Sequence, residues 1–153
     1  MKTLFTILFL AGIMVASRAQ DFGTREYIES RQCLTIGFLQ GGGSLIGIDF
    51  ETLVSDQVGL QIGGGFIGFG GGLNFHFNPG IRSSFLSLNY WHQGVNQTYT
   101  QSLVGGTFVF RAKKLLSLQL GLGFPLEQGP AWPRDMEVPP IMLLYSAGLY
   151  FPL

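Results

Sequence analysis

Two carboxylates and one histidine are the residues best suited to chemistry in this 153-residue sequence. Asp49 and Glu51 lie two positions apart, and His76 stands in a long stretch that has no other ionisable side chain. A histidine beside a carboxylate can act in general acid–base catalysis or help to hold a metal ion. Which of these roles the three residues could fill depends on the elements that position them.

Alternation of apolar and polar residues with a period of two recurs along most of the chain and predicts an all-β protein. Short connections at 54–57, 78–82 and 112–114 share one end of the predicted sheet, and the two longest, 93–101 and 125–140, share the other. This asymmetry is typical of an antiparallel barrel that crosses a bacterial outer membrane. The eight predicted strands span about residues 33–40, 44–53, 58–65, 68–77, 83–92, 102–111, 115–124 and 141–151.

The N-terminus has the layout of a secretory signal peptide. Lys2 precedes an apolar run over residues 4–16, and Ser17-Arg18-Ala19 predicts cleavage after Ala19, which leaves a barrel domain of residues 20–153. Loss of Lys2 and Arg18 leaves seven basic and nine acidic residues, a net charge of −2, which argues against a nucleic-acid partner. The single cysteine, Cys33, cannot form an internal disulfide, so a scaffold held by disulfides is excluded.

The scarcity of charge decides which face of the barrel points outward. Charged residues make up 12% of the chain, against about 25% in ordinary soluble domains. The polar face of the predicted strands consists mainly of Gly, Gln, Asn and Ser, whereas a solvated sheet face carries many charges. We therefore expect an eight-stranded up-and-down transmembrane β-barrel in the outer membrane, with its apolar face toward lipid. A secreted soluble barrel similar to lipocalins, or a soluble sandwich, is the alternative.

Several segments carry a resemblance to a known group of proteins. The stretches GFGGGLNFHF (68–77), LQLGLGF (118–124) and AGLYFPL (147–153), together with the signal peptide, resemble small outer-membrane β-barrel proteins, in particular uncharacterised barrel proteins common in Bacteroidota. The resemblance implies outer-membrane lipid and the barrel assembly machinery as partners, because a C-terminal aromatic residue helps that machinery to recognise the last strand. Phe151 lies third from the end and is followed by Pro152, which departs from the usual pattern.

The predicted inner face brings the chemically competent residues into the lumen. Asp49, Glu51 and His76 share that face with Gln61, Asn74, Asn89 and Gln119. A catalytic or metal site is one interpretation. The favoured one is a structural plug, because the lumen of eight strands is just wide enough to be filled by side chains. We therefore predict no catalytic residue, metal or cofactor, with Asp49, Glu51 and His76 as weak lumen candidates for binding. The inner glycines would leave room for these side chains, and the outward Gly64 and Gly71 would mark bulges or a turn near Phe66-Ile67.

Residues near the predicted loops offer weaker candidates. Some eight-stranded outer-membrane barrels are lipid A deacylases with a serine two residues after a histidine, but Gly94 holds that position after His92. The simpler interpretation is an interfacial aromatic cluster of His92 with Tyr90 and Trp91. Trp132 lies in a Pro-rich loop that could bind a ligand or cover the barrel mouth. The basic residues Arg82, Arg111, Lys113 and Lys114 are expected as turn charges at the short-turn end.

The resulting hypothesis is a non-enzymatic outer-membrane protein that has a structural role or binds through its outer loops, with no ligand identified. The alternatives are a barrel enzyme that acts on lipid, with His92 or His76 as base, and the soluble secreted barrel. A wide pore is disfavoured by the number of strands.

Overall fold

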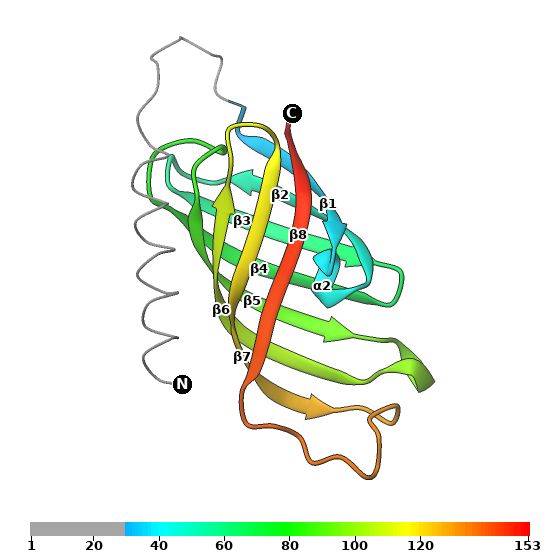
Figure 1. Cartoon of the computed structure of the whole chain (residues 1–153). Helices are drawn as coiled ribbons and strands as arrows, with labels where there is room; N and C mark the ends of the chain where they lie inside the picture. Colours follow the sequence, from blue (N-terminus) through cyan, green and yellow to red (C-terminus); the bar gives the residue numbers. More distant parts are fainter. Residues whose placement is uncertain (1–29) are drawn as a thin grey trace.

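The chain forms a closed antiparallel barrel in which each strand pairs with its neighbours in sequence and the first pairs with the last (Figure 1). This computed structural model describes residues 30–153, so the predicted signal peptide and its predicted cleavage site lie outside the described residues. The strands are β1 (Gln32–Phe38), β2 (Ile46–Leu53), β3 (Val58–Gly65), β4 (Gly68–His76), β5 (Phe85–Gln93), β6 (Gln101–Arg111), β7 (Leu116–Gln128) and β8 (Met142–Pro152). Two short helical turns, α2 (Gln40–Gly43) and η1 (Asn96–Thr98), complete the fold.

The eight-stranded antiparallel barrel predicted from the alternation is confirmed, and the main differences lie at strand ends. β3 has the predicted bounds, whereas β1 stops at Phe38 and the following residues turn into the barrel. β7 continues through Pro125 to Gln128, although Pro125 was expected to begin a loop. Proline lacks the N–H that a ladder needs, and it is tolerated here because the β6–β7 register shifts between Ser102 and Leu103, beside its partner.

The connections define two ends of the barrel. The short-turn end carries the turns at 54–57, 77–84 and 112–115 together with the chain's C-terminus, and the long-loop end carries 39–45, 66–67, 94–100 and 129–141 (Figure 1). The three connections predicted to be short are gathered at one end, but the asymmetry of length is smaller than predicted: 77–84 has eight residues and 94–100 has seven, and the two-residue turn 66–67 lies at the other end. Over residues 30–153, every helix falls short of the length and apolar character needed to cross a membrane.

The barrel interior is layered along its axis. An apolar cluster of Cys33, Leu53, Ile81 and Tyr150 fills the short-turn end, with Ile81 folded inward from the β4–β5 turn. A second cluster of Trp91, Leu103 and Leu144 lies toward the long-loop end, and Met142 packs against it. Polar side chains occupy the region between the two clusters. The apolar layers at both ends therefore enclose a polar middle.

The segment between β1 and β2 folds into the barrel at the long-loop end. Gln40, Gly41, Gly42 and Ser44 are buried, and the main chain takes left-handed conformations at Leu39, Gly41, Gly42 and Gly43. Glycine adopts this conformation without the steric cost that other residues meet. The Ser44 N–H and hydroxyl donate to the carbonyls of Gln40 and Gly41, at 3.1 Å each, which closes the segment on itself.

The inserted segment explains why the facing wall is rich in glycine. A Cβ at Gly47 would meet the Gln40 backbone, one at Gly65 would meet the Ser44 side chain, and one at Gly70 would meet Gly42. Farther along the lumen, the inward-facing glycines lie next to side chains instead of the inserted segment: Glu51 lies against Gly59, Asp49 against Gly63 and Asn89 against Gly72. The inner glycines thus leave room for the inserted segment as well as for the polar side chains that the alternation predicted.

Gly64 and Gly71 face outward, as the alternation predicted, but they do not mark bulges. The β3–β4 register runs without interruption from Val58–Phe75 to Gly65–Gly68, and Gly64 pairs directly with Phe69. A two-residue turn at Phe66-Ile67 joins the strands. The bulge expectation was therefore wrong for both residues, whereas the turn lies where it was expected.

Replacing Gly42 by alanine should destabilise the barrel by about 1–3 kcal/mol, because φ is +80° and the added Cβ would meet the Phe69 main chain. Gly106→Ala is the matched control, since a Cβ there has no heavy atom within 4 Å, and we expect its unfolding free energy to change by less than about 1 kcal/mol. Denaturant titration of the refolded variants measures both values. Equal stability of the two variants would contradict insertion of the segment.

Candidate functional site

A cluster of ionisable side chains lies in the lumen, because alternation turns every second residue of each strand inward. Glu51 on β2 accepts hydrogen bonds from Asn74 and pairs with His76, both on β4; its Oε1 lies 2.5 Å from Asn74 Nδ2 and 2.9 Å from His76 Nε2. Its other oxygen, Oε2, lies 2.7 Å from Nη2 of Arg111 on β6. The side chains of Glu51, His76 and Arg111 are at most 3% exposed.

Arg111 is the member of the cluster that the sequence analysis placed wrongly. It was expected among the turn charges, but its guanidinium points into the barrel, where Nη1 donates to the Ile81 carbonyl. The group also lies 4.8 Å from the Phe85 ring centre and 5.0 Å from that of Tyr150, within the range of cation–π attraction. Continued alternation from Thr107 through Val109 would have turned Arg111 inward, and the buried Glu51 carboxylate needed a cation.

Amide and hydroxyl groups extend this cluster around the inside of the barrel. Ser87 donates to Asn74 and, at 2.9 Å, to Asn89. Asn89 and Gln119 each donate to the Thr107 hydroxyl at 2.7 Å, and Ser146 donates to Gln119 at 2.9 Å. Together with the hydrogen bonds from Asn74 to Glu51 and Gln61, these contacts form a polar belt that links the seven strands from β2 to β8. The belt comprises Glu51, Gln61, Asn74, His76, Ser87, Asn89, Thr107, Arg111, Gln119 and Ser146.

Asp49 serves a different neighbour from Glu51, although the two share the inner face of β2. Its Oδ1 accepts a hydrogen bond from the Gly41 main-chain N–H at 3.2 Å. The carboxyl group therefore anchors the inserted segment, and its side-chain contact with Gln61 connects it to the polar belt without a direct contact to His76. No group of three or more His, Cys, Asp or Glu side chains that could hold a metal ion occurs within residues 30–153.

The geometry of the lumen favours a structural plug. Glu51 has three hydrogen-bonding or ionic contacts, one each from Asn74 and His76 on β4 and Arg111 on β6, and an ion pair buried with such partners is retained only when its geometry is good. The apolar cluster at the short-turn end covers it on one side, and the inserted segment occupies the other mouth. The charged side chains of the belt are thus paired with other side chains of the belt across the barrel.

His92 lies outside the barrel, near the long-loop end, within an aromatic group. Its ring stacks on Phe69 with 4.6 Å between ring centres and on Tyr99 with 4.3 Å, and its Nδ1 lies 3.2 Å from the Tyr90 hydroxyl. Trp91 was expected in this group, but the alternation turns it inward and it is buried against Leu103 and Leu144. The aromatic cluster around His92 therefore includes Tyr90, as predicted, but contains Phe69 and Tyr99 in place of Trp91.

The position that a deacylase-type serine would occupy requires glycine here. Gly94 has a φ of +99°, and a Cβ would meet the Thr98 main chain. Ser102 on β6 and Glu127 on β7 lie in one cross-strand row with His92, which the sequence analysis did not detect because the three are far apart in the chain. Ser102 is only 2% exposed, and His92 contacts the rings of Phe69 and Tyr99 and the hydroxyl of Tyr90.

The two long loops at this end are joined to each other. The main-chain N–H groups of Gly129 and Ala131 donate to the carbonyls of Thr100 and Tyr99, and the Tyr99 hydroxyl lies 3.3 Å from Glu127. Partial loss of water raises the pKa of the Tyr99 phenol above its ordinary value, and the Glu127 carboxylate acts in the same direction. Trp132 donates from Nε1 to the Met136 carbonyl at 2.8 Å, which ties the loop into a compact turn.

Removing the cation of the buried cluster should cost far more stability than removing an exposed one. Arg111→Met leaves the Glu51 carboxylate without its ionic partner, and we expect a loss of about 3–5 kcal/mol in unfolding free energy. Arg31→Met is the matched control, because Arg31 pairs with Asp56 at 3.7 Å and both are more than half exposed, so about 0–1 kcal/mol is expected. Losses of similar size in the two variants would argue against the buried pair.

The chain was also compared with known proteins. No protein-family model matches it, and neither the curated proteins nor the solved structures yield a significant match. Its function is therefore inferred from the chemistry of the barrel itself.

Proposed function

We propose that this chain is a non-enzymatic outer-membrane β-barrel protein that acts through its joined outer loops. The observation that carries the proposal is the inverted distribution of polarity: the interior holds the polar belt, and most outward positions of the eight strands are apolar, many of them exposed. These outward residues include Ile36, Ile48, Leu60, Ile62, Phe69, Leu73, Phe75, Leu86, Leu88, Val104, Leu118, Leu120, Leu122, Leu143, Tyr145 and Leu149.

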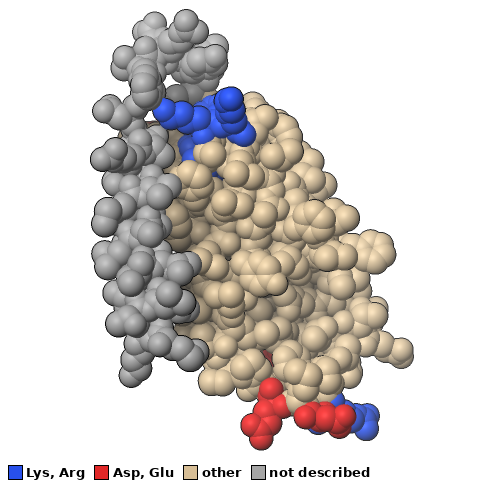
Figure 2. Space-filling model, viewed as in Figure 1, with Lys and Arg blue, Asp and Glu red and all other residues tan. Residues whose placement is uncertain are grey.

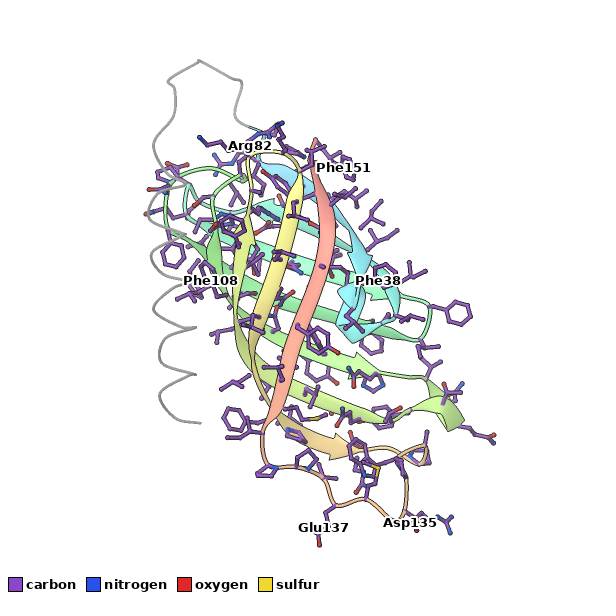
Figure 3. The ribbon with its side chains drawn as sticks, viewed as in Figure 1. Phe38, Arg82, Phe108, Asp135, Glu137 and Phe151 are labelled. Atoms are coloured by element: carbon purple, nitrogen blue, oxygen red, sulfur yellow. The ribbon has the colours of Figure 1, made fainter. Side chains whose placement is uncertain are left out.

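The arrangement of charge supports a lipid environment around this wall. Of the charged residues within 30–153, Asp49, Glu51 and Arg111 lie inside the barrel, and the others lie at or near its two ends. Figure 2 shows this on the face in view, where basic groups gather at one end, acidic groups with a basic one at the other, and the wall between is uncharged. Figure 3 places Arg82 at the short-turn end, and Asp135 and Glu137 at the opposite one.

A soluble barrel would have to keep this apolar wall in water. The largest exposed apolar patch of an ordinary soluble monomer covers about 300–600 Å², whereas here the apolar positions continue around the whole circumference. Lipid removes that cost, and a closed barrel satisfies the main-chain hydrogen bonds that a membrane leaves without water. The usual arrangement of such barrels then directs the short turns to the periplasm and the long loops outward.

Because the lumen is filled, we place the function of the protein in its loops rather than in transport of a solute. The polar belt and the inserted segment fill the space through which a solute would pass. The outer end presents the loops at 94–100 and 129–141, fixed to each other by main-chain hydrogen bonds and carrying Trp132, Arg134, Asp135 and Glu137. Loops held on a rigid scaffold commonly carry binding functions.

Fractionation of cells that express the full chain tests the location. We expect the protein in the outer-membrane fraction, extracted by detergent, with a folded band whose gel mobility changes on heating. A protein released in the soluble periplasm without such a band would contradict the membrane barrel.

The alternative of a lipid-acting enzyme has its own test. The His76→Ala/His92→Ala double variant and the Ser102→Ala variant are compared with wild type, and unchanged lipid A acylation removes that alternative.

A charge placed in the middle of the wall should destabilise the folded barrel in a bilayer far more than a charge near the outer end. Leu120→Arg introduces a guanidinium at a position 56% exposed on β7, and the expected loss in folding free energy in a bilayer is about 2–4 kcal/mol. Leu126→Arg, at 60% exposure toward the end of β7, is the control, with about 0–1 kcal/mol expected. Folding into lipid vesicles measures both, and a harmless Leu120→Arg would favour a soluble barrel.

A further inference from the structure

The rim of the barrel at the long-loop end is stepped. The seven-residue β1–β2 connection turns inward and the β3–β4 connection has only two residues, whereas the β5–β6 loop, also of seven residues, and the thirteen-residue β7–β8 loop reach farther along the barrel (Figure 1). Strand length differs in the same way. The strands β1–β4 have 7 to 9 residues, whereas β6, β7 and β8 have 11, 13 and 11 residues. One side of the wall is therefore lower than the other.

The low side is short relative to a membrane. At about 3.3 Å per residue and a tilt of about 40°, the 8 residues of β2 or β3 rise about 20 Å along the barrel axis, less than the ~25 Å apolar band of outer-membrane barrels. The 13 residues of β7 rise about 33 Å by the same measure. The tips of the first two hairpins would then end inside or at the edge of the apolar layer, and β7 would pass through it.

The residues of the low rim have the chemistry that this position demands. The tip of the β3–β4 hairpin is Phe66-Ile67, where a turn in water would carry Asn, Asp or Gly, and Phe66 is 88% exposed. Phe38, Leu45 and Ile46 on the neighbouring hairpin are each about 60% exposed. Residues 32–48 contain no charged side chain, and neither do residues 58–81, so the rim continues the apolar outer wall without a polar break.

The turn also limits the polar main-chain groups that it would expose to lipid. The Phe66 N–H donates to the Ile46 carbonyl at 3.2 Å, and the Ile67 carbonyl accepts from the Gly94 N–H at 2.5 Å. Leu39 donates to the Leu45 carbonyl at 3.3 Å, which closes the inward-turning segment. Main-chain groups bonded within the protein are the condition for non-helical chain at membrane depth.

We propose that the low rim, formed by Phe38, Leu45, Ile46, Phe66 and Ile67, lies within the outer leaflet and is covered by the acyl chains of its lipids. The high rim of β5–β8 with its charged loops stands in water. The inserted segment Gln40–Gly43, directly behind the low rim, then separates the polar belt from the acyl chains. This inference rests on the proposed membrane location and adds the depth and the lipid contact of a specific part of the rim.

Nitroxide labels on three variants, each with one cysteine added to the native Cys33, test the inference in phosphatidylcholine vesicles. Phe66→Cys reports on the low rim, Leu88→Cys on the middle of the wall and Gln97→Cys on a long loop. Wild type is the background control, because Cys33 is fully buried and should not react in the folded barrel. Collision with oxygen, which concentrates in lipid, is compared with collision with a water-soluble nickel chelate.

We expect the labels at Phe66 and Leu88 to favour oxygen over the chelate several-fold, and the label at Gln97 to show the reverse. A label at Phe66 that behaves like Gln97, with Leu88 in lipid, would overturn the low-rim inference alone. An aqueous label at Leu88 would overturn the membrane location itself. A label at Phe66 shielded from both reagents, or coupled magnetically to a second copy, would assign the rim to a protein partner and also overturn the inference.

Discussion

The volume enclosed by eight strands is the constraint on which the rest of this structure depends. A sheet closed at this strand number leaves an interior that side chains just fill, so every inward residue must fit beside its neighbours across the lumen. Here the interior also accepts a stretch of main chain, from Leu39 to Ser44. Glycine on the facing strands is the consequence, because Gly47, Gly65 and Gly70 each lie where a Cβ would meet the segment.

The same constraint makes the buried charges interdependent. Glu51, His76 and Arg111 come from strands that are far apart in sequence, and each is enclosed with almost no contact to solvent. A charge in such a place is costly unless partners satisfy it, and the pair of carboxylate and guanidinium removes net charge from the cluster. The belt of amides and hydroxyls then fixes the directions of these groups, because Asn89 and Gln119 donate to Thr107 on the neighbouring strand and Ser146 donates to Gln119. The polar side chains therefore fill the interior and also have defined orientations within it.

Much of this architecture could be predicted from alternation alone. Period two identified eight strands, their antiparallel order and the inward position of Glu51, Asn74 and His76. It did not identify the inward turn at Leu39–Ser44, since left-handed main chain at consecutive glycines has no periodic signal. Arg111 was missed for another reason: its position one residue before a turn suggested solvent, and only the three-dimensional requirement of Glu51 for a cation places it inside. The row of His92, Ser102 and Glu127 depends on strand register, which the spacing of residues along the chain does not encode.

Glycine has opposite consequences on the two sides of this wall, and the difference connects the lumen to the proposed lipid surface. Inside, a missing Cβ admits the segment that closes the mouth of the barrel. Outside, Gly64 and Gly71 sit beside Phe69 and Ile62, so the large side chains of adjacent positions cover the wall where glycine contributes no surface. Water competes for the main-chain hydrogen bonds of a strand, whereas lipid does not. Glycine-rich strands in a closed ladder would therefore lose less stability in lipid than in water. In the membrane barrel that we propose, the glycine-rich strands and the low apolar rim at their tips are therefore two results of one arrangement, in which main chain enters the lumen and lipid would cover the wall.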